Sequence, residues 1–379
     1  MEDSARTIAS IVAAYDGQGV HRTGTPVDDA SARWLAALIA EAGVKPELIP
    51  FRLDRIDVAA ARATVNGVAY DGLPRFDAPP TGPDGVSGTL GSLGSDADIA
   101  MVATAARGDR TVEAARRGTS HKAILNVTLS DPPGLTPINA DGLTRPFGPP
   151  MLQLSSEHRG ALERAAKAGA KATMTIEMQR TPAEAFNVEA RIAGRNAKLA
   201  PLVVMTPRSG WWRCASERGG GLVLFLEILR AVKAAGPARD VIFTANSGHE
   251  LGHLGLEHFI HADPGLVKGA QCWIHLGANF AAAIGPQVRL QASDEALFAQ
   301  ARAALADAGA EADIETPVGQ RPRGEARNIS DGGGRYVSLL GGNGLFHHEA
   351  DRWPDAVDVA KTAKLATAFG ALAVALAAG

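Results

Sequence analysis

The residues best suited to chemistry lie in one stretch, 241–260, which reads VIFTANSGHELGHLGLEHFI. His249, Glu250 and His253 follow the HExxH pattern, in which two histidines one helical turn apart bind zinc and the glutamate activates water. The longer form of this pattern ends in a third histidine, but here the next glycine and the next histidine come one residue too early. The pattern is therefore incomplete as a zinc motif.

The elements that must carry these residues also argue against a self-contained HExxH motif. Val241–Phe243 is an apolar run typical of a strand, and Asn246-Ser247-Gly248 is typical of a turn. His249 follows this turn at once, whereas HExxH requires its first histidine inside a helix. Open α/β sheets place their ligands outside the carboxyl ends of the strands. We therefore expect a site at a strand-to-helix junction, with His253 directed to helix packing or solvent.

The chain after Phe186 alternates between apolar strand patterns and amphipathic helix patterns. Such alternation predicts an α/β fold, a three-layer sandwich with a mostly parallel central sheet. Expected strands are 202–205, 241–244 and 272–276; expected helices are 221–234, 294–308 and one that begins at Pro354. Short strands and Pro/Gly-rich loops between residues 51 and 185 predict an inserted β-rich domain. The main domain then consists of residues 1–50 and 186–379.

Composition limits the possible partners. The net charge of −3 gives no electrostatic basis for binding nucleic acid or an anionic membrane. The apolar tail 365–378 is shorter than the roughly 18 residues of a membrane span, so we expect a core helix. Two cysteines are too few for a disulfide scaffold, and no secretory signal is evident. We expect a cytoplasmic protein that acts on a small molecule or short peptide. An oligomer is compatible with the sequence.

Seven segments together resemble the di-zinc aminopeptidase family, which also contains glutamate carboxypeptidases and glutaminyl cyclase. They are SARWLAALIAEAG, FNVEARIAG, LVVMTPRSG, ERGGGLVLFLEILRAV, DVIFTANSGHELGHLG, IHLGANF and FHHEADRWPDAVD. The resemblance covers nearly the whole chain, although the active-site motifs are only partly kept. Family members commonly carry a protease-associated domain as an insert. The resemblance thus implies a zinc exopeptidase-like domain with a protease-associated-like insert at 51–185.

The resemblance implies one zinc ion. The family's bridging aspartate matches Glu217, its ligand glutamate matches Glu250 and its final histidine matches His347. Residues able to bind one of the two metals are therefore present at all three matching positions. The second metal has lost a histidine to Thr206 and an aspartate to His275, which makes that ion doubtful. Two carboxylates and one imidazole leave an open coordination position, as a catalytic zinc site requires.

The resemblance also assigns catalytic roles. His249 stands where the family has its glutamate base, and an imidazole can accept a proton near neutral pH. We hypothesise that Arg208 replaces the charge of the second metal. His275 would then donate to the same substrate oxygen.

Trp211, Trp212 and Arg213 follow Arg208 and are expected to bind substrate. Arginines recognise carboxylates and phosphates, and tryptophans supply flat apolar walls, which favours a small anionic substrate. Surface arginines beside a half-buried tryptophan pair are the alternative interpretation.

Three functions remain open from the sequence. The first is a metal-dependent hydrolase, aminopeptidase-like, that cleaves an amide-type bond. Replacement of the glutamate base by His249 favours a second, a lyase or cyclase on the same fold. Changes at Thr206 and His275 favour a third, a non-catalytic homologue with a decayed zinc site.

Overall fold

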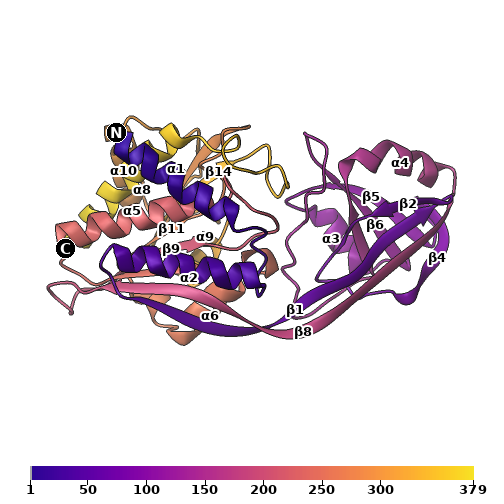
Figure 1. Ribbon diagram of the computed structural model, residues 1–379, viewed down its shortest axis with the longest axis horizontal. Coiled ribbons are helices and arrows are strands. Elements are labelled where there is room, and N and C mark those ends of the chain that lie inside the picture. The colour runs from indigo at the N-terminus through magenta and orange to yellow at the C-terminus, as the bar shows by residue number, and fades with distance from the viewer. Residues whose placement is uncertain (1) are drawn as a thin grey trace.

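The computed structural model describes residues 2–379 and shows two lobes joined by two long strands (Figure 1). These strands are β1 (Pro46–Val65) and β8 (Lys171–Ile192), which pair antiparallel along almost their whole length. We call the part at the chain termini the main lobe, and residues 66–170 with the adjoining strand ends the inserted lobe. The expected domain boundaries at 50/51 and 185/186 fall inside β1 and β8, because both strands continue from one lobe into the other.

The sheet of the main lobe is mixed, with four parallel and two antiparallel strand pairs, so the expectation of a mostly parallel sheet is not confirmed. Its strands run in the order β13-β12-β14-β11-β9-β10-β8, and the four central strands are parallel. β8 pairs antiparallel with β10, and β12 pairs antiparallel with β14 but parallel with β13. Both reversals occur where the connection, 193–201 or 277–286, contains no crossover helix to return the chain. The strands are β9 (Leu202–Pro207), β10 (Val241–Asn246), β11 (Cys272–Leu276), β12 (Gln287–Ala292), β13 (Ile314–Glu315) and β14 (Tyr336–Gly342).

Helices cover both faces of this sheet. Val204 of β9 faces the larger helical layer, whereas Val203 and Met205 face the smaller one, as the period of two in a strand requires. The larger layer contains α1 (Glu2–Gly17), α2 (Pro26–Glu41), α5 (Gly219–Ala235), α8 (Glu295–Asp307) and α10 (Val359–Ala377). The smaller layer contains α6 (Leu254–Ala262), α7 (Leu266–Gly269) and α9 (Ala326–Asp331). The three-layer arrangement is therefore present.

The last helix, α10, begins at Val359 rather than Pro354. The Asp358 side chain accepts a hydrogen bond from the Lys361 amide and caps the helix there. Within residues 2–379, α10 alone is long and apolar enough by composition to cross a membrane. It packs against α5 and α8, with Leu365, Phe369 and Leu372 in the core.

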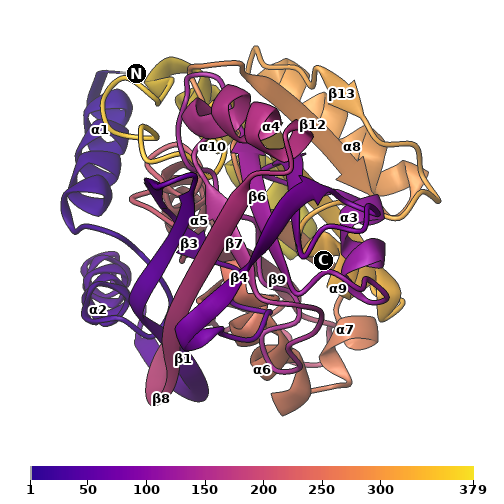
Figure 2. The ribbon, with the colours of Figure 1, turned by 90° about the vertical axis from the view of Figure 1, so that its right-hand side faces the viewer.

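The inserted lobe has its own apolar core and lies in front in Figure 2. Parallel strands β5, β6 and β7 form its centre, and β4 joins them to β8. Its elements are β2 (Val68–Asp71), β3 (Leu73–Pro74), β4 (Gly82–Ser92), β5 (Ile99–Ala105), α3 (Arg110–Arg116), β6 (Ala123–Leu129), β7 (Met151–Leu154), η1 (Ser156–His158) and α4 (Arg159–Lys167). Likeness to a protease-associated domain stays a prediction.

One segment of the insert contacts the main lobe and shapes the site. We call residues 131–150 the docking loop. Its Ala140 amide donates to the carbonyl of Glu250, and Ala140 and Leu143 share an apolar cluster with Phe51 and Trp211. The docking loop therefore lies against the strand-to-helix junction after β10.

Candidate active site

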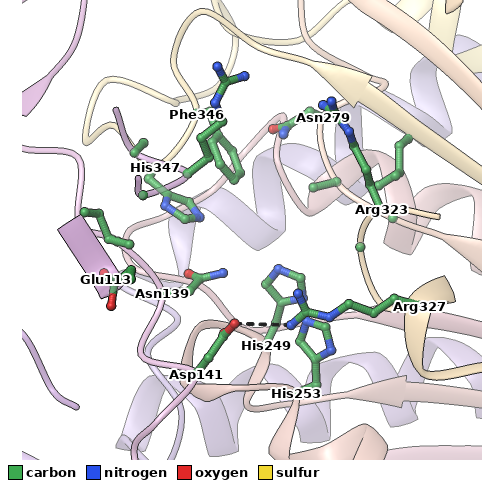
Figure 3. Close-up of a pocket in the computed structure, with 18 of the residues that line it drawn as sticks. Glu113, Asn139, Asp141, His249, His253, Asn279, Arg323, Arg327, Phe346 and His347 are labelled. Atoms are coloured by element: carbon green, nitrogen blue, oxygen red, sulfur yellow. Dashed lines mark hydrogen bonds and ion pairs between the residues drawn. The ribbon is translucent and has the colours of Figure 1, made fainter. Parts of the chain in front are cut away.

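A cavity of about 900 Å³ lies where the two lobes meet, beyond the carboxyl ends of β10 and β11. The main lobe contributes four histidines to its wall, His249, His253, His275 and His347. The inserted lobe contributes polar residues, among them Glu113, Asn139 and Asp141. Figure 3 shows side chains from both lobes around the same space. This position agrees with the rule that open α/β sheets bind ligands outside the carboxyl ends of their strands.

Two of the histidines and one carboxylate form a group that could hold a metal ion. His249, His253 and Glu325 are buried, and one ligand atom of each lies within 4.8 Å of the others. The Nδ1 atom of His249 is 3.3 Å from Oε1 of Glu325, and Nε2 of His275 is 3.7 Å from the other carboxylate oxygen. Two imidazoles and a carboxylate are ligands that suit zinc.

Neighbouring side chains orient these imidazoles. Nδ1 of His253 lies 2.8 Å from Oδ1 of Asn328, an acceptor, so Nδ1 carries the proton and Nε2 keeps its lone pair. Nδ1 of His275 similarly lies 2.8 Å from the Ser338 hydroxyl. Such second partners are typical of histidines that bind metals.

Several buried polar atoms here have no hydrogen-bond partner within the described chain. They include Nδ1 of His249, Nε2 of His275 and Oε1 of Glu325. Because unsatisfied buried polar atoms are rare and costly, a group of them facing one space fits a missing cation.

The charges in this group also suit a cation. Burial opposes ionisation of Glu325, but the imidazoles of His249 and His275 outweigh it, so the pKa of Glu325 lies well below its ordinary value. Burial and the Arg218 guanidinium lower the pKa of His249 to about 3. At neutral pH the carboxylate is therefore ionised and the imidazole neutral, the forms in which both bind metals.

The HELGH segment reaches this arrangement through turns and not through a continuous helix. His249 begins the short 3₁₀ helix η2 (His249–Leu251), which lies between Gly248 and Gly252, both at φ 90°. His253 has φ 65° and precedes α6. These left-handed residues bring the rings of His249 and His253 together, with centroids 5.0 Å apart.

Glu250 points away from the cavity. Its carboxylate accepts hydrogen bonds from the Thr23 amide, the Thr23 hydroxyl and the Ser209 hydroxyl, at 2.7 to 2.8 Å. It is fully buried and does not line the cavity. The structure thus does not bring Glu250 to Glu217 and His347, with which the sequence grouped it.

Glu217 and His347 do meet, as the resemblance implied. Oε1 of Glu217 lies 3.6 Å from Nε2 of His347, and Oε2 accepts from the His347 amide. However, the buried Arg218 guanidinium lies 2.7 Å from Oε1 and compensates the charge of Glu217. Nδ1 of His347 lies 2.6 Å from the carbonyl of Pro137 in the docking loop. This pair therefore already has a cation beside it.

The other predicted site residues support the cavity from behind. Arg208 is fully buried, 2.9 Å from Asp28, and does not line the cavity. Trp211 donates to Asn139 and Trp212 donates to the carbonyl of His347. Arg213 donates to the carbonyl of Asp16. None of these last three lines the cavity either.

Sequence reasoning missed Arg218 and Glu325, and it directed His253 elsewhere. The available signal for Glu325 was an acidic residue in the basic stretch RPRGEAR, directly before a short helix. His253 was marked by HELGH itself.

Three solved structures with similar folds cover nearly the whole chain. A zinc aminopeptidase from Bacillus subtilis has a TM-score of 0.77 at 18% identity, over 96% of this chain and 93% of that one. An aminopeptidase from Aneurinibacillus sp. strain AM-1 has 0.76 at 15%, over 99% and 94%. A peptidase M28 precursor from Shewanella amazonensis SB2B has 0.76 at 14%, over 100% and 96%. The chain has the zinc exopeptidase fold.

No family model matches this sequence, and no curated protein matches it. At such low identity, likeness of structure establishes the fold alone. What this zinc exopeptidase fold does here must be argued from its own residues.

Proposed function

We propose that this protein is a metal-dependent hydrolase that cleaves an amide bond in a small, peptide-like substrate. The observation that carries the proposal is the buried group of His249, His253 and Glu325, whose unsatisfied atoms adjoin a cavity in a zinc exopeptidase fold. Three such ligands leave one position open for water or substrate. When bound, zinc would polarise a carbonyl group and lower the pKa of water.

We propose one ion and not two. The second group of candidate ligands, Glu217 and His347, already contains the Arg218 guanidinium. A fixed positive charge 2.7 Å from a carboxylate oxygen repels a further cation. Arg218 thus takes the part that the sequence suggested for Arg208.

His347 is placed to accept a proton. Because its Nδ1 donates to the Pro137 carbonyl, Nε2 keeps a lone pair, and His347 lines the cavity. Burial lowers the pKa of His347, so the ring is neutral near pH 7. Glu217, 3.6 Å from Nε2, stabilises the imidazolium once the proton arrives. An imidazole oriented by a carbonyl and backed by a carboxylate suits general base catalysis.

His275 serves the carboxylate ligand in this proposal. Its Nε2 atom flanks Oε2 of Glu325 at 3.7 Å, while Ser338 holds the opposite side of the ring. It therefore restricts the orientation of Glu325.

Metal analysis combined with turnover tests the proposal. Protein purified without added zinc should contain about one zinc per chain and should hydrolyse members of a panel of aminoacyl nitroanilides and dipeptides. Glu325→Gln should lose both metal and activity, whereas Glu315→Gln, at an exposed ion pair with Arg302, should keep both. A metal-free wild type without turnover would contradict the proposal. Products without oxygen from labelled water would indicate a lyase or cyclase instead.

A further inference from the structure

The wall of the cavity is strongly basic. Eight arginines line it against four acidic residues. The arginines are Arg75, Arg107, Arg110, Arg117, Arg145, Arg289, Arg323 and Arg327, and the acids are Asp77, Asp109, Glu113 and Asp141. This excess contrasts with the net charge of −3 of the whole chain. The positive charge is therefore concentrated at the cavity.

All four acidic residues are already engaged. Asp77 and Glu113 form ion pairs with Arg75, and Asp141 with Arg327. Asp109 accepts from the first amides of α3 as its cap. They leave the other lining arginines uncompensated.

Arg289 and Arg323 stand out among these arginines. Neither forms an ion pair with a carboxylate among residues 5–379, whose side chains the structure describes; in that range the Arg289 guanidinium donates only to the Thr316 hydroxyl. The Arg323 amide donates to Oε1 of Gln291, and Nε2 of Gln291 donates to the Arg323 carbonyl, so Arg323 lies against β12 two residues from Arg289, and both arginines line the cavity. Burial, followed by the charge of Arg323, lowers the pKa of Arg289. Two like charges side by side without a counterion are unfavourable.

Exposed arginines elsewhere on this protein include both paired and unpaired ones. Several of them lie within 3.2 Å of a carboxylate oxygen, namely Arg33, Arg62, Arg159 and Arg302. Arg321, two residues before Arg323, pairs with Asp331. Others, such as Arg52 and Arg164, form no ion pair with a described carboxylate. What distinguishes the cavity is that six arginines without such a partner line it together, which calls for an anionic ligand.

The pair lies beside the metal-binding group. Arg323 is two residues before Glu325 in the chain, and Figure 3 shows it on the side of the cavity opposite His347. Arg289 lies on β12, opposite Leu340 of β14, and β14 leads to His347. A substrate group held by the two arginines therefore lies near the proposed ligand Glu325 and across the cavity from the proposed base, His347.

We propose that Arg289 and Arg323 bind a carboxylate of the substrate, so that the hydrolase selects acidic peptide-like molecules. Guanidinium groups form paired hydrogen bonds with carboxylates, and two of them around one anion relieve their mutual repulsion. Arg107, Arg110, Arg117 and Arg145 on the opposite lobe favour further negative charge on the same substrate. This inference rests on the proposed hydrolase function for its substrate, but the anion site itself is independent of catalysis.

Calorimetric binding of glutarate tests the anion site, with glutaramide as the neutral analogue of equal length. The wild type, with its metal removed by chelator, should bind glutarate at least about tenfold more tightly than glutaramide. Binding should weaken as salt is added, because exposed charges are screened. Arg289→Gln and Arg323→Gln should each weaken glutarate binding about tenfold or more and leave glutaramide unchanged.

Arg321→Gln is the matched control, since it removes an arginine of the same loop that does not line the cavity. It should bind glutarate like the wild type. Equal affinity for glutarate and glutaramide, or unchanged affinity in both cavity variants with native circular dichroism, would overturn the proposal. So would inorganic phosphate binding more tightly than glutarate, which would assign the pair to phosphate.

Turnover separates this inference from the proposed function. If dipeptides are hydrolysed with the same kcat/KM whether they carry a free carboxylate or its amide, and Arg323→Gln changes neither value, the carboxylate selection fails while the hydrolase stands. If glutarate binds through the arginines but no zinc is found and nothing is hydrolysed, the hydrolase fails while the anion site stands.

Discussion

Replacing Arg218 with methionine should convert a one-metal protein into a two-metal protein. Arg218 and Glu217 are both fully buried and lie 2.7 Å apart. The guanidinium also donates through Nε to the Ser209 carbonyl at 2.7 Å. Arg218→Met therefore leaves a buried carboxylate whose Oε1 faces only Nε2 of His347. Breaking one side of a buried ion pair costs about 3–5 kcal/mol of unfolding free energy.

Zinc should restore most of this loss in the variant. An ion that binds only the folded protein adds about 4 kcal/mol when present at roughly 1,000 times its dissociation constant. We expect native mass spectrometry to count one zinc in the wild type and two in Arg218→Met. Urea unfolding followed by tryptophan fluorescence should show the variant destabilised without zinc and largely recovered with it.

Arg208→Met supplies the control for this experiment. Arg208 forms an equally buried ion pair with Asp28, at 2.9 Å, but lies away from the cavity. Its loss should destabilise the protein by a similar amount, with one zinc bound and no recovery on adding more. Two zinc ions in the wild type, or one zinc in Arg218→Met with no recovery, would refute the assignment of Arg218 as the charge that excludes a second ion.

Three further predictions follow from the site and its buried histidines. Glu325→Gln should lower zinc affinity by at least about 10- to 100-fold, whereas Glu250→Gln should keep zinc bound, because Glu250 is held by Thr23 and Ser209; equilibrium dialysis measures both. His347→Gln should lower kcat by about 10²- to 10⁴-fold while zinc content stays unchanged, and equal losses of zinc and kcat would contradict its role as base. The pKa of His21 is lowered by burial to about 3, so between pH 6.5 and 3 the unfolded chain binds the extra proton and stability falls as pH falls; in His21→Gln the urea midpoint should change less between pH 7 and 5.

The sequence located three strands of the main lobe but missed β12, β13 and β14. Strand 272–276 was predicted with the bounds it has, and 202–205 and 241–244 within two residues, because apolar runs between turn residues mark a buried strand directly. Whether a strand runs parallel or antiparallel to its neighbour depends on whether the connection before it contains a crossover helix. The residues of β12 itself do not reveal this. The hairpin between β1 and β2 turns at Asn66-Gly67, both with positive φ, and this dipeptide is a strong hairpin signal in a sequence.

The position of a site residue could be predicted only when its neighbours are close in sequence or are set by the fold. Glu217 and His347 come together because the strand ends of the fold bring them there. The direction of Glu250 is decided by Thr23 and Ser209, which are distant in sequence and offer it three hydrogen bonds. Arg218 does not stand at a position where the family has a metal ligand, so nothing in the sequence pattern singled it out. Its compensation of the Glu217 charge is evident only from the structure, in which both side chains are buried together.

HELGH illustrates how a motif can be mistaken in its geometry and still mark a site. Its two histidines do converge, yet the glycines on either side of η2 break the helix that HExxH requires. Without that helix, Glu250 turns into the main lobe, where Thr23 and Ser209 hold its carboxylate, and does not lie beside His249 and His253 as the pattern demands. The carboxylate near His249 and His253 comes instead from Glu325, at the start of α9. Replacing Gly252 with alanine should displace His253 from His249 and Glu325, because the residue has φ 90° and its added Cβ would lie 3.1 Å from the Asp141 carbonyl oxygen. Zinc content of Gly252→Ala, compared with that of Gly309→Ala, also at positive φ but with nothing within 4 Å, should fall only in the former.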